Sequence, residues 1–63
     1  MTRLVALQKH LVEHGCIVVR EGGRHTVWRN PRSGARSTVP RHREIPRTTA
    51  RSICRQLDVP LLE

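Results

Sequence analysis

The chain has 63 residues, of which 37% are hydrophobic, and its twelve Lys and Arg against five Asp and Glu give a formal net charge of +7. A chain this short buries only about 60% of the surface that its unfolded form exposes, which leaves room for one domain over residues 1–63 with a thin core. No apolar run is long enough to span a membrane, so the composition excludes a membrane protein and we expect a cytoplasmic one. The excess of positive charge, almost all of it arginine, favours a nucleic-acid partner.

The first predicted element is an amphipathic helix over roughly residues 2–14. Thr2 is a suitable N-cap, and Gly15 supplies the C-terminal stop. Apolar residues recur at the spacing of one helical face, which would pack on a core. This face consists of Leu4, Leu7, Leu11 and Val12.

Three short strands follow, separated by two turns. Gly22 and Gly23 form a loop pair suited to the positive φ angles of a tight hairpin. The segment 30–34 is dense in turn-forming residues and reverses the chain a second time. Together these signals predict a three-stranded antiparallel meander. Its strands are residues 16–20, 24–30 and 36–39.

A second helix follows Pro46, with Thr48 or Thr49 as its cap. Its apolar residues recur at helical spacing, at Ala50, Ile53, Cys54 and Leu57. The element order is therefore helix-strand-strand-strand-helix. We predict a small two-layer α+β domain in which both helices cover one face of the three-stranded antiparallel sheet.

The alternation of the second strand places its histidine and its tryptophan on opposite faces. His25, Val27 and Arg29 share one side of this strand, and Trp28 lies on the other. Trp28 is the larger hydrophobe, so its side should face the core and leave His25 toward solvent or a ligand. Arg24 and Arg29 could then hold a phosphate near the imidazole.

This setting suits RNA cleavage. The reaction needs no metal and no external nucleophile, because the 2′-hydroxyl already lies beside the scissile phosphate; a positioned base and nearby cations are enough. We predict His25 as the catalytic base or acid, RNA as the substrate, and no cofactor. An ordinary surface histidine beside a turn is the alternative.

The positive surface extends well beyond this turn. Arg41, His42 and Arg43 directly follow the third strand, and the second helix carries arginines at i,i+4 spacing. A solvated basic face explains such residues as well as a nucleic-acid interface does. The predicted RNA-binding residues are Arg24, Arg29, Arg41, His42, Arg43, Arg47 and Arg51.

An alternative hypothesis for the first helix is a zinc site, because residues 10–14 match the H-x-x-E-H pattern of some zinc peptidases. Gly15 ends the helix at once, however, and no acidic residue offers a third ligand. We therefore predict no metal site. Cys16 and Cys54 form no Cys-x-x-Cys pair and are expected to be small buried hydrophobes.

Four segments match, in order, the motifs of one known family. Residues 10–15 look like the end of its first helix, residues 20–25 resemble its Arg-x-x-Gly-Ser-His signature, and residues 39–42 are similar to its Val-Pro-x-His segment. The chain thus resembles the HicA-type toxins of bacterial toxin–antitoxin systems. Matches to the last helix of that family are Glu44, Ile45, Thr49, Arg51, Ile53, Arg55, Gln56 and Val59.

The resemblance implies a fold like that of a double-stranded-RNA-binding domain and a metal-independent mRNA interferase that blocks translation. It implies a HicB-type antitoxin as partner, with any oligomer formed through the antitoxin, and it maps the catalytic histidine onto His25. Three residues depart from the family pattern: Arg24 replaces a serine, Cys16 an aromatic residue and Thr48 a glycine. Two other functions stay open, a non-catalytic RNA-binding module and a protein whose basic surface binds an acidic partner.

Overall fold

The computed structural model describes residues 1–62, and its elements confirm the predicted α+β class. In chain order they are β1 (Thr2–Arg3), α1 (Leu4–Glu13), β2 (Ile17–Glu21), β3 (His25–Arg29), β4 (Arg36–Pro40), β5 (Glu44–Ile45) and α2 (Arg47–Gln56). The three predicted strands and two predicted helices are all present, with ends shifted by at most three residues. The short strands β1 and β5 were not expected.

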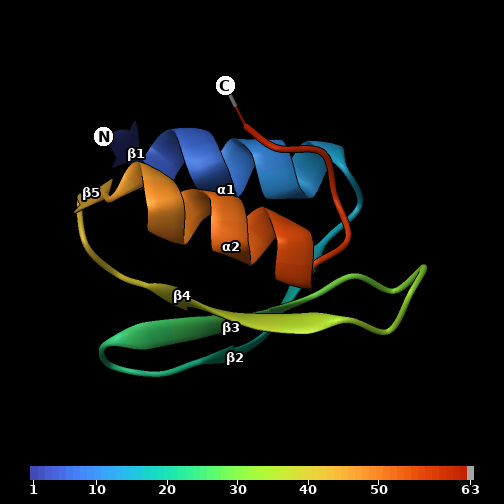
Figure 1. Ribbon diagram of the computed structural model, residues 1–63. Coiled ribbons are helices and arrows are strands. Elements are labelled where there is room, and N and C mark those ends of the chain that lie inside the picture. The colour runs from blue at the N-terminus through green and yellow to red at the C-terminus, as the bar shows by residue number, and fades with distance from the viewer. Residues whose placement is uncertain (63) are drawn as a thin grey trace.

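The molecule has two layers, with α1 and α2 on the same side of an antiparallel sheet in the order β2-β3-β4 (Figure 1). The core lies between these layers and draws Leu7 and Leu11 from α1, Ile53 from α2, and Trp28 and Val39 from the sheet. The opposite side of the sheet carries no helix. Within the described residues, neither helix has the length and apolar character that crossing a membrane requires.

The pairing of β1 with β5 changes how the first helix begins. Thr2 pairs with Ile45, so it belongs to an extended segment, and the prediction that it caps α1 is wrong. Arg3 takes the cap position without a side-chain hydrogen bond, and the Leu4 N–H donates to the Arg43 carbonyl at 2.9 Å. A ribbon of two-residue strands leaves no periodicity in the sequence, which is why the pattern does not predict it.

Val12 does not belong to the core face of α1, contrary to the prediction. Its side chain is 61% exposed, whereas Leu7 and Leu11 are fully buried. Residues four apart lie above one another on a helix, but Val12 is turned a further 100° past Leu11 and away from the sheet. The core face of α1 is therefore narrower than the apolar pattern suggests.

The prediction that a threonine caps α2 is also wrong. Pro46 occupies the cap position, and the Ala50 N–H donates to its carbonyl at 3.0 Å. Thr48 and Thr49 consequently lie inside the first turn of the helix. The fixed φ of Pro46 suits a helix start without any help from a hydroxyl cap.

Both helices end in the same type of C-terminal motif. After α1, Gly15 has a φ of 84° and the Cys16 N–H donates to the Leu11 carbonyl at 2.9 Å, which confirms the predicted stop. After α2 the left-handed position is held by Asp58, with a φ of 57°. This is a conformation that glycine adopts at lower cost.

Two side-chain hydrogen bonds join the sheet to α2. The Asn30 amide donates to the Leu57 carbonyl at 2.7 Å, and its side-chain oxygen accepts the Arg32 N–H at 3.0 Å. Ser37 donates to the Gln56 side-chain oxygen at 2.7 Å. These bonds hold the end of β3 and the start of β4 against the helix layer.

Candidate active site

His25 directly follows the turn between β2 and β3. The backbone of this turn differs from the tight hairpin that the two glycines suggest. Glu21 pairs with Thr26, so four residues lie between the last paired positions. The Gly22 N–H donates to the His25 carbonyl at 2.8 Å, and neither Gly22 nor Gly23 has a positive φ. The prediction of positive φ angles here is wrong, because four-residue loops are commonly built around type I turns, which do not need them.

Arg41, which directly follows β4, holds this turn. Its backbone N–H donates to the Arg24 carbonyl at 3.0 Å, and its guanidinium donates to the Gly22 carbonyl at 3.2 Å. His25 itself pairs with Pro40, the last residue of β4. The position of His25 is therefore set by backbone bonds on both sides of β3.

The predicted orientation of β3 is confirmed. Thr26 and Trp28 are buried under the helices, whereas His25 is exposed on the side of the sheet without helices. The Trp28 indole N–H is buried without a hydrogen-bond partner among the described residues. Burial of the single large aromatic ring thus decides which face of β3 presents the histidine.

A hollow beside the turn brings together several of the predicted residues. It is lined by Gly23, Arg24, His25, Arg41 and His42, and we call it the His25 hollow. Two imidazoles and two guanidiniums surround this space. Such a set can transfer protons at two points and stabilise negative charge between them.

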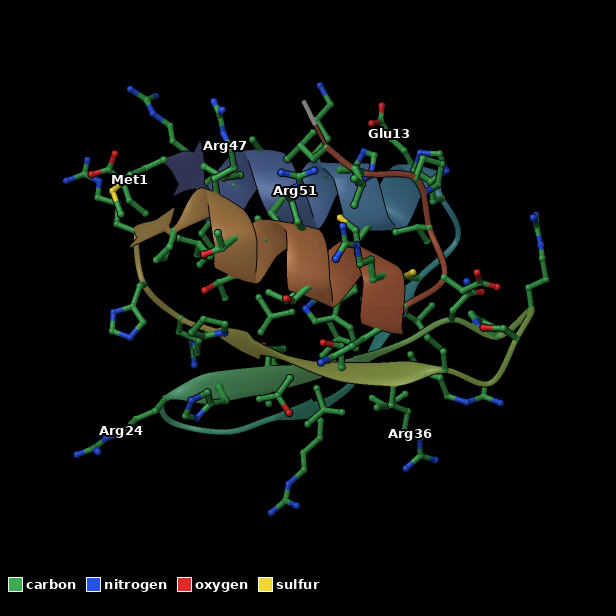
Figure 2. The ribbon with its side chains drawn as sticks, in the orientation of Figure 1. Met1, Glu13, Arg24, Arg36, Arg47 and Arg51 are labelled. Carbon is green, nitrogen blue, oxygen red and sulfur yellow. The ribbon has the colours of Figure 1, made fainter. Side chains whose placement is uncertain are left out.

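The remaining predicted residues lie elsewhere. Arg29 is four residues from His25 along β3, about 13 Å at the rise of a strand, and it does not line the His25 hollow. Arg47 and Arg51 line a separate hollow next to Met1, and Figure 2 shows both on the far side of the molecule from Arg36. Arg43 lines a third hollow, with Lys9 and Glu44 among its neighbours.

Comparison with known protein families identifies the family of this chain. The model of the family described as the HicA toxin of bacterial toxin-antitoxin matches residues 6–59. The chain belongs to the HicA toxin family. The matched residues include the entire His25 hollow. Comparison with curated proteins and with solved structures gives no significant match.

Membership of the HicA family makes this chain the toxin of a toxin–antitoxin pairing. Arg24 is one of the three residues that depart from the family pattern. Arg24 lines the His25 hollow, and Figure 2 shows its side chain extending from the turn at the end of the sheet. A cation therefore stands next to His25 where the HicA signature has a small hydroxyl.

Sequence reasoning missed Arg20 as a neighbour of the site. Val18 pairs with Trp28 but Arg20 pairs with Val27, so β2 contains one extra residue, Val19. This bulge turns Arg20 to the same side of the sheet as His25. Because residues 17–19 are all β-branched and apolar, their pattern carries no sign of the register change.

The histidines of α1 do not form part of this site. The rings of His10 and His14 lie 4.6 Å apart, and His10 donates to the Pro60 carbonyl at 2.6 Å. Within residues 1–62, no three His, Cys, Asp or Glu side chains are grouped so that they could hold a metal ion.

The two cysteines are free and buried, as predicted. Cys16 and Cys54 both belong to the hydrophobic core. Burial raises the pKa of the Cys16 thiol, and the nearby Cys54 raises it further. The Cys16 thiol is therefore a protonated, unreactive core side chain at neutral pH.

Proposed function

We propose that this HicA-family toxin is a metal-independent endoribonuclease that cleaves mRNA and so inhibits translation in the cytoplasm. A HicB-type antitoxin would neutralise it. The observation that carries the proposal is the His25 hollow, where two histidines and two arginines surround one space at the exposed end of the sheet beside the β2–β3 turn. No carboxylate lines this hollow, so a phosphate diester can approach it without like-charge repulsion.

In the proposed reaction, His25 accepts the proton of the ribose 2′-hydroxyl. The 2′-oxygen forms a bond to the adjacent phosphorus, and the bond from phosphorus to the 5′-oxygen breaks. His42 donates a proton to that leaving 5′-oxygen. The products are a 2′,3′-cyclic phosphate and a free 5′-hydroxyl, and no atom or electron is needed from outside the substrate and the two imidazoles.

The arginines have different parts in this scheme. Arg24 is free to stabilise the charge that develops on the non-bridging phosphate oxygens. Arg41 already donates to the Gly22 carbonyl, so it is a positioning residue that holds the turn beside His25. Arg43, Arg47 and Arg51 line other hollows, and we do not assign them to the reacting phosphate.

The first test removes the proposed base. His25→Ala should lower RNA cleavage in EDTA by roughly 10²- to 10⁴-fold and relieve growth inhibition, the range that one proton-transfer group contributes. His14→Ala is the matched control, since His14 is an exposed histidine at the end of α1. Cleavage by His25→Ala at the rate of the control would refute the assignment. RNA binding without cleavage by the wild-type protein would indicate a non-catalytic RNA-binding module.

The second test separates the acid from the base. An RNA whose scissile 5′-oxygen is replaced by sulfur has a leaving group that needs no proton. His42→Ala should cleave ordinary RNA at least about 10²-fold more slowly than wild type but cleave the sulfur-containing RNA at nearly the wild-type rate. His25→Ala should be slow on both substrates. An equal loss on both substrates for His42→Ala would show that His42 is not the acid.

A further inference from the structure

The side of the β2–β3–β4 sheet away from both helices forms a surface that extends well beyond His25. We call it the open face (Figure 1). Strand pairing puts His25, Val27 and Arg29 of β3 on this face together with the residues directly opposite them. These are Ile17 and Arg20 of β2 and Arg36, Thr38 and Pro40 of β4.

The positive charges of the open face have no acidic counterpart on it. The acidic residues of the described chain lie at the end of α1, on the helix-covered side of β2, in β5 and after α2. Arg29 and Arg36 are directly opposite one another, a placement in which like charges repel. A bound anion between them would remove that repulsion, so the open face favours a polyanion.

The bulge in β2 joins these charges to the His25 hollow. If β2 were a regular strand without the bulge at Val19, alternation would place Arg20 on the helix-covered side of the sheet. With the bulge, Arg20 lies opposite Val27 and diagonal to His25, about 7–8 Å away. Arginine side chains therefore follow the open face from the hollow, through Arg20, to the pair at Arg29 and Arg36.

We propose that the substrate crosses the open face as a single strand of RNA, with the reacting phosphate at His25 and flanking phosphates on Arg20 and on the Arg29–Arg36 pair. This inference rests on the proposed function. His25 and Arg29 are about 13 Å apart along β3, so they contact different phosphates of one strand. The face is about 10 Å wide between its outer strands, which suits one strand better than a duplex. Attack by the 2′-oxygen also requires a nucleotide free to align with its leaving group, and base pairing restricts that freedom.

The test measures RNA binding separately from cleavage. All binding proteins carry His25→Ala, and the probe is a fluorescent single-stranded RNA of mixed sequence, titrated from 50 to 200 mM KCl. One variant adds Arg29→Ala and Arg36→Ala, a second adds Arg47→Ala and Arg51→Ala, and a third adds Arg32→Ala and Arg55→Ala as a charge-matched control. Thermal unfolding confirms that each is folded, and Arg36→Ala alone replaces the first variant if it is not.

The open-face variant should bind roughly tenfold or more weakly, and the slope of log affinity against log salt should fall by about 0.7, because the pair contacts one phosphate of the single strand. A duplex of the same length should compete poorly. An equal loss in all three variants, a loss confined to Arg47 and Arg51, or tighter binding of the duplex would each overturn the proposal. Unchanged RNA affinity with lost affinity for an acidic antitoxin would assign the open face to that protein instead.

The test of the open-face RNA track can fail independently of the test of the catalytic assignment. If His25→Ala still cleaves RNA, the catalytic assignment fails whatever the binding data show. If cleavage depends on His25 but Arg29→Ala with Arg36→Ala leaves KM unchanged, the catalytic assignment stands and the open-face track fails. In an otherwise wild-type protein, the expected result for this pair is a raised KM with a nearly unchanged kcat.

Discussion

Substitution of Gly22 by alanine tests whether the position of His25 depends on the turn. A methyl group at Gly22 would lie 3.0 Å from the His25 carbonyl oxygen, whereas ordinary contacts begin at 3.4 Å. The same oxygen accepts the Gly22 N–H at 2.8 Å, so relief of the clash must disturb this hydrogen bond and move the His25 backbone by a few tenths of an ångström. Gly23 offers a matched control, since a methyl group there meets nothing within 4 Å.

The expected cost follows from this geometry. Crowding of this kind costs about 1–3 kcal/mol in a packed core, and an exposed turn relaxes more easily, so we expect about 1 kcal/mol for Gly22→Ala. In a domain of this size that lowers the unfolding temperature by roughly 4–8 °C. Since displacement of a reacting group by 1 Å can cost about 10²-fold, a smaller shift should lower RNA cleavage about tenfold.

The assays are thermal unfolding, RNA cleavage and hydrogen exchange at the amide of residue 22. Gly22→Ala should exchange this amide faster than wild type, because the bond to the His25 carbonyl is weakened. Gly23→Ala should keep the wild-type exchange rate and an unfolding free energy within about 0.5 kcal/mol of wild type. Equal effects of the two substitutions would show that the contact between Gly22 and His25 does not control the turn.

Three further predictions concern stability. Asn30→Ala should lower the free energy of unfolding by about 2–3 kcal/mol in a denaturant titration, because it leaves the Leu57 carbonyl without its donor; a loss below 1 kcal/mol would contradict this. Asp58→Gly should raise it by about 0.5–1 kcal/mol, since glycine adopts a φ of 57° without strain; a decrease would contradict this. Because burial and Cys54 raise the pKa of Cys16 above 9.0, the unfolded chain loses this proton first, so stability should fall as pH rises above about 9; a Cys16→Ala variant should show a shallower fall between pH 8 and 10.

The orientation of β3 could be predicted from the sequence because one residue decides it. Trp28 is the single aromatic side chain, and no alternative face offers comparable burial, so His25 must point outward. Gly15 was predictable for a similar reason, since a positive φ after a helix strongly favours glycine. In both cases a local residue preference and the tertiary structure agree.

The register of the three strands, in contrast, could not be predicted. The bulge at Val19 lies in a run of β-branched residues where either face is equally apolar, so alternation carries no information there. The closeness of His42 to His25 depends on the pairing of His25 with Pro40, which the length and hydrogen bonds of the 30–35 turn set. Both arrangements that give the candidate site its chemistry therefore arise from strand pairing.

The residues of the candidate site therefore contribute little to the stability of the fold. His25 and His42 are exposed, and neither belongs to the core between the layers, so their removal should cost little stability. Arg41 differs, because one side chain both lines the hollow and donates to the Gly22 carbonyl. Loss of activity in Arg41→Ala would thus mix lost charge with a displaced turn, whereas Arg41→Lys keeps the charge and tests the hydrogen bond. The amide of residue 22 distinguishes the two causes, since only a displaced turn changes its exchange rate.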